Sequence, residues 1–130
     1  MGVVVGYLAT PEGRAALDAA VREARARDAS VVVVVSVRAD DGVEGRERVE
    51  GELAQVDAEL AAAGVAHEIR LLDGGDVADD LIATAEELSA ELIVLGLRRR
   101  SPVGKLILGV NAQRVLFDAP CPVLTVKPAS

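Results

Sequence analysis

The residues best suited to hold a ligand lie in the segment from Gly96 to Asn111, which is rich in glycine and arginine. Glycine lets backbone amides come close to a phosphate, arginine pairs with phosphate through parallel hydrogen bonds, and a helix beginning near Asn111 presents its positive end. The alternative is that the arginines at 98–100 are solvated and that Gly96 and Gly109 only satisfy turn geometry. Spacing alone leaves both interpretations open.

This segment departs from both common phosphate-binding motifs. A P-loop reads G-x-x-x-x-G-K-[ST]; Gly104-Lys105 is present, but Arg99 stands at the first glycine and Leu106 at the hydroxyl position. The dinucleotide fingerprint G-x-G-x-x-G is missing after the first predicted strand, where Gly6-Tyr7-Leu8-Ala9-Thr10 leads directly into a helix. The sequence therefore supports neither a P-loop protein nor a dehydrogenase.

Few residues are placed for catalysis. His67 falls on a predicted strand, distant from Cys121 and the serines in any simple topology, so a surface or edge-strand histidine is expected rather than a triad member. Cys121 lies between two prolines, which favours a structural thiol. The acidic run from Asp73 to Asp80 can bind a hard cation or cap a helix, and the second interpretation is preferred. We expect no catalytic residue and no metal site, and we do not expect an enzyme.

Composition narrows the class of protein. At 130 residues the chain is expected to form one domain, 1–130, with an aliphatic core, because 51% of its residues are hydrophobic but only Tyr7 and Phe117 are aromatic. A formal charge of −7 and the lack of tryptophan argue against nucleic-acid binding. The longest apolar run, Ser30–Val37, is too short to cross a membrane, and the N-terminus does not read as a signal peptide. These features predict a cytoplasmic protein without membrane contact.

Short β-branched segments alternate with helical patterns. Strands are predicted at 2–7, 31–37, 65–72, 92–95 and 122–127. The intervening segments repeat apolar residues at helical spacing: Leu17, Ala20, Val21 and Ala24; Val49, Leu53, Val56 and Leu60; Val77, Leu81, Ala85 and Leu88; Ala112, Val115, Leu116 and Ala119. Helix caps are expected at Thr10, Gly64, Asp76 and Asn111, and a loop is expected at Asp40–Gly45.

Five strands alternating with four helices predict an α/β fold, a doubly wound sandwich around a five-stranded parallel sheet. The unbroken valines of 31–35 suit a central strand covered on both faces, whereas the polar residues within 65–72 suit an edge. If the fourth strand returns beside the first, the ligand crevice lies between the loops at 7–11 and 96–111. The glycine- and arginine-rich segment is then in the right place for a ligand.

Essentially the whole chain resembles a known family, and the segments 74–81 and 90–96 match that family's approach to its fourth strand. GLRRRSPVGKLILG at 96–109 and NAQRVLFDAPCPVLTV at 111–126 closely resemble the C-terminal signature of the universal stress protein family, and VVVGYLATPEGRAALDAA at 3–20 resembles its first strand, loop and helix. The resemblance implies the strand order 3-2-1-4-5 and a role in stress response or signalling. It also implies a homodimer formed through the last strand, at Val123, Leu124, Thr125 and Val126.

The same resemblance implies a nucleotide site. ATP-binding members carry G-x-x-G-x9-G-[ST] in this loop and an aspartate after the first strand; here two glycines of the motif are kept, while Arg99, Val110 and Leu8 depart from the pattern. The implied adenine contacts are the backbone near Tyr7, Leu8 and Val37. The implied phosphate contacts are Gly96, Arg98, Arg99, Gly109, Val110 and Asn111, with ATP and Mg as cofactor and slow ATP hydrolysis still allowed.

Each departure removes a specific contact. Arg99 adds a side chain where backbone must come close, Val110 deletes a hydroxyl donor, and Leu8 deletes a carboxylate. The arginines can compensate by contacting phosphate through their side chains. The alternative function is a nucleotide-independent dimeric interaction module with a degenerate ATP site, which recruits an unidentified partner protein.

Overall fold

The computed structural model describes residues 2–7, 11–37, 42–73, 76–97 and 110–127 of the chain. Within these ranges none of the helices is both long and apolar enough to cross a membrane. Strands and helices alternate as predicted. They are β1 (Gly2–Gly6), α1 (Pro11–Arg27), β2 (Ser30–Val37), α2 (Gly42–Ala62), β3 (His67–Asp73), α3 (Val77–Leu88), β4 (Leu92–Gly96), α4 (Val110–Asp118) and β5 (Val123–Val126).

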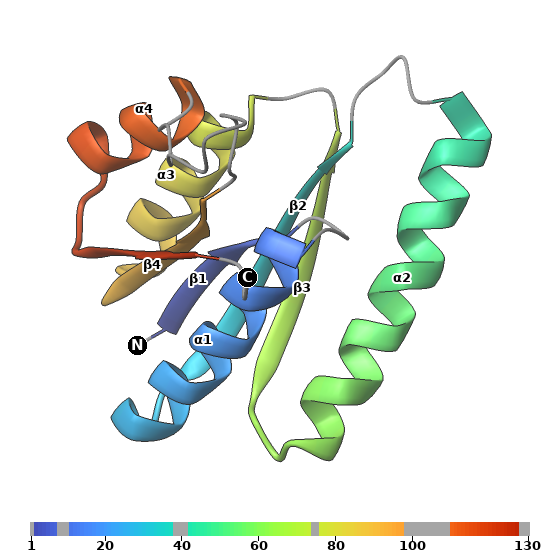
Figure 1. Cartoon of the computed structure of the whole chain (residues 1–130), viewed down its shortest axis with the longest axis horizontal. Coiled ribbons are helices and arrows are strands. Elements are labelled where there is room, and N and C mark those ends of the chain that lie inside the picture. The colour runs from blue at the N-terminus through green and yellow to red at the C-terminus, as the bar shows by residue number, and fades with distance from the viewer. Residues whose placement is uncertain (1, 8–10, 38–41, 74–75, 98–109, 128–130) are drawn as a thin grey trace.

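The five strands form one parallel sheet in the order β3-β2-β1-β4-β5, which confirms the predicted α/β topology. β1 lies at the centre, with Gly6 opposite Val34 of β2 and Val5 opposite Val94 of β4. Helices α1 and α2 cover one face, and α3 and α4 cover the other (Figure 1). The winding direction therefore reverses between β1 and β4.

The central strands are buried on both faces. Val3 and Val5 point into an apolar cluster under α1 and α2, while Val4 points into a second cluster under α3 and α4. The valines of 31–35 divide between the two clusters in the same way, and none is more than 5% exposed. The core is aliphatic as predicted, since Tyr7 is its single aromatic residue and Phe117 is 85% exposed.

Three helices end in the same hydrogen-bonded turn. In each, an amide donates to the carbonyl five residues earlier: Ala29 to Ala24 (2.8 Å), Val65 to Leu60 (3.2 Å) and Ala90 to Ala85 (2.9 Å). The residue before each donor is left-handed: Asp28 (φ 54), Gly64 (φ 72) and Ser89 (φ 50). Gly64 was predicted as the stop of α2, and this is confirmed. The other two turns use residues with a Cβ, which carry a steric cost that glycine avoids.

Several predicted boundaries are wrong. Residues 42–45 belong to α2 and not to a loop, because Glu44 favours the helix N-terminus and Arg46 pairs with Glu50 one turn later at 3.3 Å; Asp40 and Asp41 lie outside the described residues. β3 begins at His67 and not at residue 65, because the amide of Val65 is used to close α2.

Of the three caps predicted at helix N-termini, one is confirmed, one is wrong and one lies outside the described residues. Asp76 caps α3 as predicted, accepting from the amides of Ala78 (2.9 Å) and Asp79 (3.2 Å). α4 starts at Val110, so Asn111 is its second residue and not its cap. α1 starts at Pro11 as predicted, while its expected cap, Thr10, lies outside the described residues.

Placing glycine at the other two left-handed positions is expected to stabilise the fold. Asp28→Gly and Ser89→Gly should each raise the free energy of unfolding by about 0.5–1 kcal/mol, because each relieves the clash of a Cβ in this conformation. Gly64→Ala is the matched reverse change and should lower it by about 1 kcal/mol. Urea unfolding measures all three. A loss of stability in Asp28→Gly or Ser89→Gly would show that the native side chain contributes more than its strain costs.

Candidate functional site

The carboxyl ends of β1 and β4 mark the position at which the topology predicts a ligand crevice. β1 ends at Gly6, β4 ends at Gly96, and the two strands are direct neighbours in the sheet. The helices that follow them, α1 and α4, lie on opposite faces, so their N-termini lie on either side of these strand ends. This is the topological position at which parallel α/β sheets bind ligands.

Two of the predicted adenine contacts, Tyr7 and Val37, lie at the carboxyl ends of their strands, and their side chains are buried. Tyr7 follows β1 directly and is 8% exposed, and burial raises the pKa of its hydroxyl. Its amide donates to the carbonyl of Val34 at 3.0 Å, so this amide is not a free donor for a ligand. Val37 ends β2 and is 5% exposed. Any ligand contact from these two residues is therefore restricted to backbone.

Gly96 has a packing role that sequence reasoning missed. A Cβ at this position would lie 2.1 Å from the carbonyl oxygen of Glu12 and 2.6 Å from its carbonyl carbon. The first turn of α1 thus rests directly on the end of β4, which only glycine allows. The sequence suggested that Gly96 admits a ligand; the helix contact accounts for this glycine whether or not a ligand binds.

The remaining predicted contacts divide into two groups. Val110 and Asn111 form the first two positions of α4, at the crevice. Leu8, Arg98, Arg99 and Gly109 lie outside the described residues, so their ligand contacts stay predictions.

A cluster of charges next to the crevice was not predicted. Arg114 of α4 bonds Asp76 (Nη1 to Oδ1, 3.1 Å) and, through Nη2, Asp79 of α3. Asp80 accepts from the hydroxyl of Ser36 at 2.6 Å. No sequence spacing indicates these pairs; the only signal is the topology, which places the N-termini of α3 and α4 at one edge. The acidic run thus caps and ties helices, and in the described part of the chain no group of three or more acidic, histidine or cysteine side chains could hold a metal ion.

Comparison with known proteins identifies the family. The model of the universal stress protein family matches residues 1–127. A relative from Mycolicibacterium smegmatis named universal stress protein is 44% identical over 126 residues, 97% of each chain. The chain belongs to the universal stress protein family.

Solved structures of the family share the whole fold. A universal stress protein from Archaeoglobus fulgidus is 32% identical to this chain, with a TM-score of 0.83 and coverage of 98% of each chain. A second structure from Archaeoglobus fulgidus, in complex with dAMP, is 27% identical, with a TM-score of 0.78 and coverage of 98% of each chain. The family resemblance read from the sequence is therefore confirmed over essentially the whole chain.

His67 ties the third strand of this universal stress protein to its second helix. Its Nε2 lies 2.7 Å from Oδ1 of Asp57 in α2 and its Nδ1 lies 2.8 Å from the carbonyl oxygen of Val65. Both partners are acceptors, so the imidazolium, which donates from both nitrogens, fits best. The Val65 carbonyl and then Asp57 raise the pKa of His67. The histidine lies on an edge strand, as predicted.

Cys121 sits at the other edge of the sheet, next to β5. It packs against the apolar cluster under α3 and α4, and burial raises the pKa of its thiol. A raised thiol pKa lowers the thiolate fraction and hence the reactivity. The predicted structural role is consistent with this environment, and β3 and β5 keep His67 and Cys121 at opposite edges.

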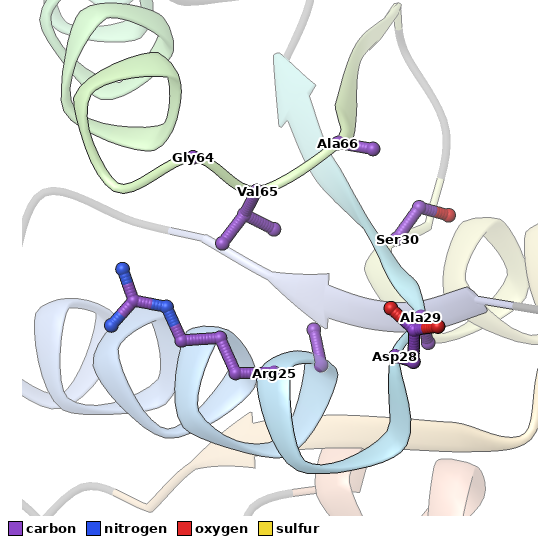
Figure 2. Close-up of a pocket in the computed structure, with 8 residues that line it drawn as sticks. Arg25, Asp28, Ala29, Ser30, Gly64, Val65 and Ala66 are labelled. Atoms are coloured by element: carbon purple, nitrogen blue, oxygen red, sulfur yellow. The ribbon is translucent and has the colours of Figure 1, made fainter.

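The structure also has a polar recess, at the opposite end of the sheet from the crevice. Figure 2 shows it between the C-terminal ends of α1 and α2, with Arg25 and Asp28 on one side and Val65 on the other. Its volume is about 380 Å³, and Arg25 donates to the carbonyl of Ala63 at the end of α2. Both charged side chains are exposed, and none of the lining residues is a buried polar group. We interpret it as the gap where two helix-terminating turns meet.

Substitution of Gly96 is expected to be far more damaging than substitution of a glycine with free space. Gly96→Ala should lower the free energy of unfolding by about 2–3 kcal/mol, because its Cβ would overlap the Glu12 carbonyl. Gly51→Ala, in the middle of α2, is the control. Its Cβ would meet nothing within 4 Å, and alanine favours a helix over glycine, so the free energy of unfolding should rise by up to about 1 kcal/mol. Thermal and urea unfolding measure both. Equal stability of the two variants would contradict the packing role of Gly96.

Proposed function

We propose that this universal stress protein is a cytoplasmic stress-response module that binds an adenine nucleotide at the β1–β4 crevice, and that it is not an enzyme. The observation that carries the proposal is the strand reversal between β1 and β4, where the N-termini of α1 and α4 lie on opposite faces of the sheet. It is supported by the 27% identical universal stress protein from Archaeoglobus fulgidus, which is in complex with dAMP. A helix N-terminus favours a phosphate because its first amides have no helical partner.

The departures from the ATP-binding pattern set the chemistry of the proposed site. Without a glycine at Arg99 and a hydroxyl at Val110, phosphate binding depends on the guanidinium groups of Arg98 and Arg99 and on the start of α4. Such charge-based binding is sensitive to salt. Leu8 leaves no carboxylate after β1, so Mg would be carried by the phosphates of ATP and would not be held by the protein.

The proposed binding is tested by calorimetric titration of nucleotide-free protein with ATP–Mg, AMP and cyclic AMP. We expect saturable binding in the micromolar range that Gly109→Trp abolishes, because a bulky side chain would fill the phosphate position before α4. Gly51→Trp, a bulky change on an exposed turn of α2, should leave binding unchanged. If the wild type gives neither heat nor a thermal shift at millimolar nucleotide, the nucleotide proposal is wrong and the interaction module is favoured.

We further propose a homodimer through β5, which serves either function. The two sheet edges differ: β3 carries the charged Glu68 and Arg70, which discourage strand pairing, whereas β5 reads Val-Leu-Thr-Val and is half-buried throughout. The amides of Ile93 and Leu97 donate to the carbonyls of Pro122 and Val126. Because backbone groups alternate along a strand, Val123 and Thr125 direct theirs outward, away from β4.

Helix α4 provides a second part of the proposed interface. Successive residues of a helix are about 100° apart, so if Arg114 faces α3 and Val115 faces the core, Leu116 faces away from α3. A two-fold pairing of β5 with itself would place the two α4 helices on the same face of the joined sheet. Leu116 is 38% exposed, which suits a residue that a partner copy covers.

The dimer proposal predicts opposite results for prolines at neighbouring positions of β5. Thr125→Pro removes an outward amide and should abolish the dimer while the monomer stays folded, because edge positions tolerate proline. Leu124→Pro removes an amide directed at β4 and should destabilise the monomer itself. Leu116→Asp should weaken the dimer without touching the sheet. Sedimentation velocity and circular dichroism separate these effects; a dimer that survives Thr125→Pro would place the interface elsewhere.

A further inference from the structure

Helix α4 is held to the rest of the protein by few apolar contacts. It has nine residues, and of its side chains that the structure describes only Val115 is fully buried, at 1% exposed. Ala112 is only partly buried, whereas Leu116 and Phe117 are 38% and 85% exposed. One buried valine fixes the distance of a helix from a sheet but leaves its rotation and slide poorly determined. A second contact is needed to fix where the N-terminus of α4 points.

Arg114 supplies that contact. Its guanidinium spans two carboxylates of α3, Asp76 and Asp79, with one nitrogen on each. Asp76 is at the same time the N-cap of α3 and accepts from the amide of Ala78 at 2.9 Å, so its side chain is itself fixed. A planar fork held at two points restricts rotation as well as distance. The middle of α4 is thereby tied to the N-terminus of α3, near the carboxyl ends of the strands.

We propose that Arg114 is a positioning residue for phosphate: it holds the N-terminus of α4 where its first amides can reach the phosphate of a nucleotide. This inference rests on the proposed nucleotide function. Hydrogen bonds from backbone amides weaken steeply beyond about 3.2 Å, so a shift of α4 by about 1 Å would remove them. Arg114, Asp76 and Asp79 are 38%, 45% and 62% exposed, so their ion pairs contribute little to global stability. The effect of Arg114 on nucleotide affinity can therefore be measured separately from its effect on the stability of the fold.

Positioning and simple charge effects make opposite predictions for Asp79. If Arg114 acted only by neutralising the carboxylates near the phosphate, Asp79→Asn would remove a negative charge and strengthen nucleotide binding. If Arg114 acts by holding α4, Asp79→Asn removes half of its anchor and weakens binding. The effects of Asp79→Asn and of a substitution of Arg114 on ATP affinity would also be non-additive, because each breaks the same contact.

The experiment is calorimetric titration of wild type, Arg114→Gln, Asp79→Asn and the double variant with ATP, AMP and adenosine. We expect Arg114→Gln to weaken ATP binding about tenfold while adenosine binding stays within twofold, since adenosine lacks the phosphate. Asp79→Asn should also weaken ATP binding, and the double variant should bind ATP no more weakly than Arg114→Gln does. Arg46→Gln is the matched control, because it makes the same charge change in an ion pair on α2.

Amide hydrogen exchange of the free protein gives a second readout. Arg114→Gln should speed exchange in α4 but not in α1 or α2, because only α4 loses its anchor. Unchanged exchange in α4, unchanged ATP affinity, an equal loss for ATP and adenosine, or stronger ATP binding in Asp79→Asn would each overturn the proposal. If wild type binds no nucleotide, the proposed function fails and this inference fails with it. If wild type binds and Arg114→Gln binds equally, only this inference fails.

Discussion

Burial of the central strands on both faces is the constraint on which the rest of this structure depends. Val3, Val4 and Val5 are all 0% exposed, and their alternation sends neighbouring side chains into opposite apolar clusters. A sheet of this kind needs a helical layer on each side, and right-handed crossovers then force the winding direction to reverse once. The crevice at the ends of β1 and β4 is a consequence of that reversal. The position of the candidate site thus follows from the hydrophobic pattern of the core.

The aliphatic core also lets α1 pack close to the sheet at Gly96. Alanines occupy most of the inner positions of this helix, and Ala16, Ala20 and Ala24 are each 0% exposed. Small side chains let a helix approach closely, and at Gly96 the approach reaches the limit at which no Cβ fits beside the Glu12 carbonyl. The first turn of α1 and the end of β4 are therefore held as a unit. This contact fixes one wall of the crevice, whereas α4, on the other side, has only Val115 fully buried among its described side chains.

The sequence predicted the order and type of the elements, because runs such as 31–35 and the apolar faces of the helices carry strong periodicity. The prediction failed where a residue bonds to an element other than the one that its local pattern suggests. Val65 is β-branched and reads as strand, but its amide closes α2. From its local pattern, Arg114 is indistinguishable from other surface arginines. Its partners Asp76 and Asp79 lie 38 and 35 residues away in the sequence. Pairs of this kind depend on how two packed helices are rotated, which local patterns do not encode.

Gly96 shows why a motif glycine can mislead a prediction of ligand binding. In the family pattern it is the first of three glycines of a nucleotide loop, and its retention here suggested a retained site. The contact with Glu12 would preserve this glycine even in a member that holds no nucleotide, because an alanine would clash with helix α1. Its presence therefore does not discriminate between a nucleotide site and a closed, degenerate one. The discriminating positions are the departures from the nucleotide-binding pattern at Leu8, Arg99 and Val110.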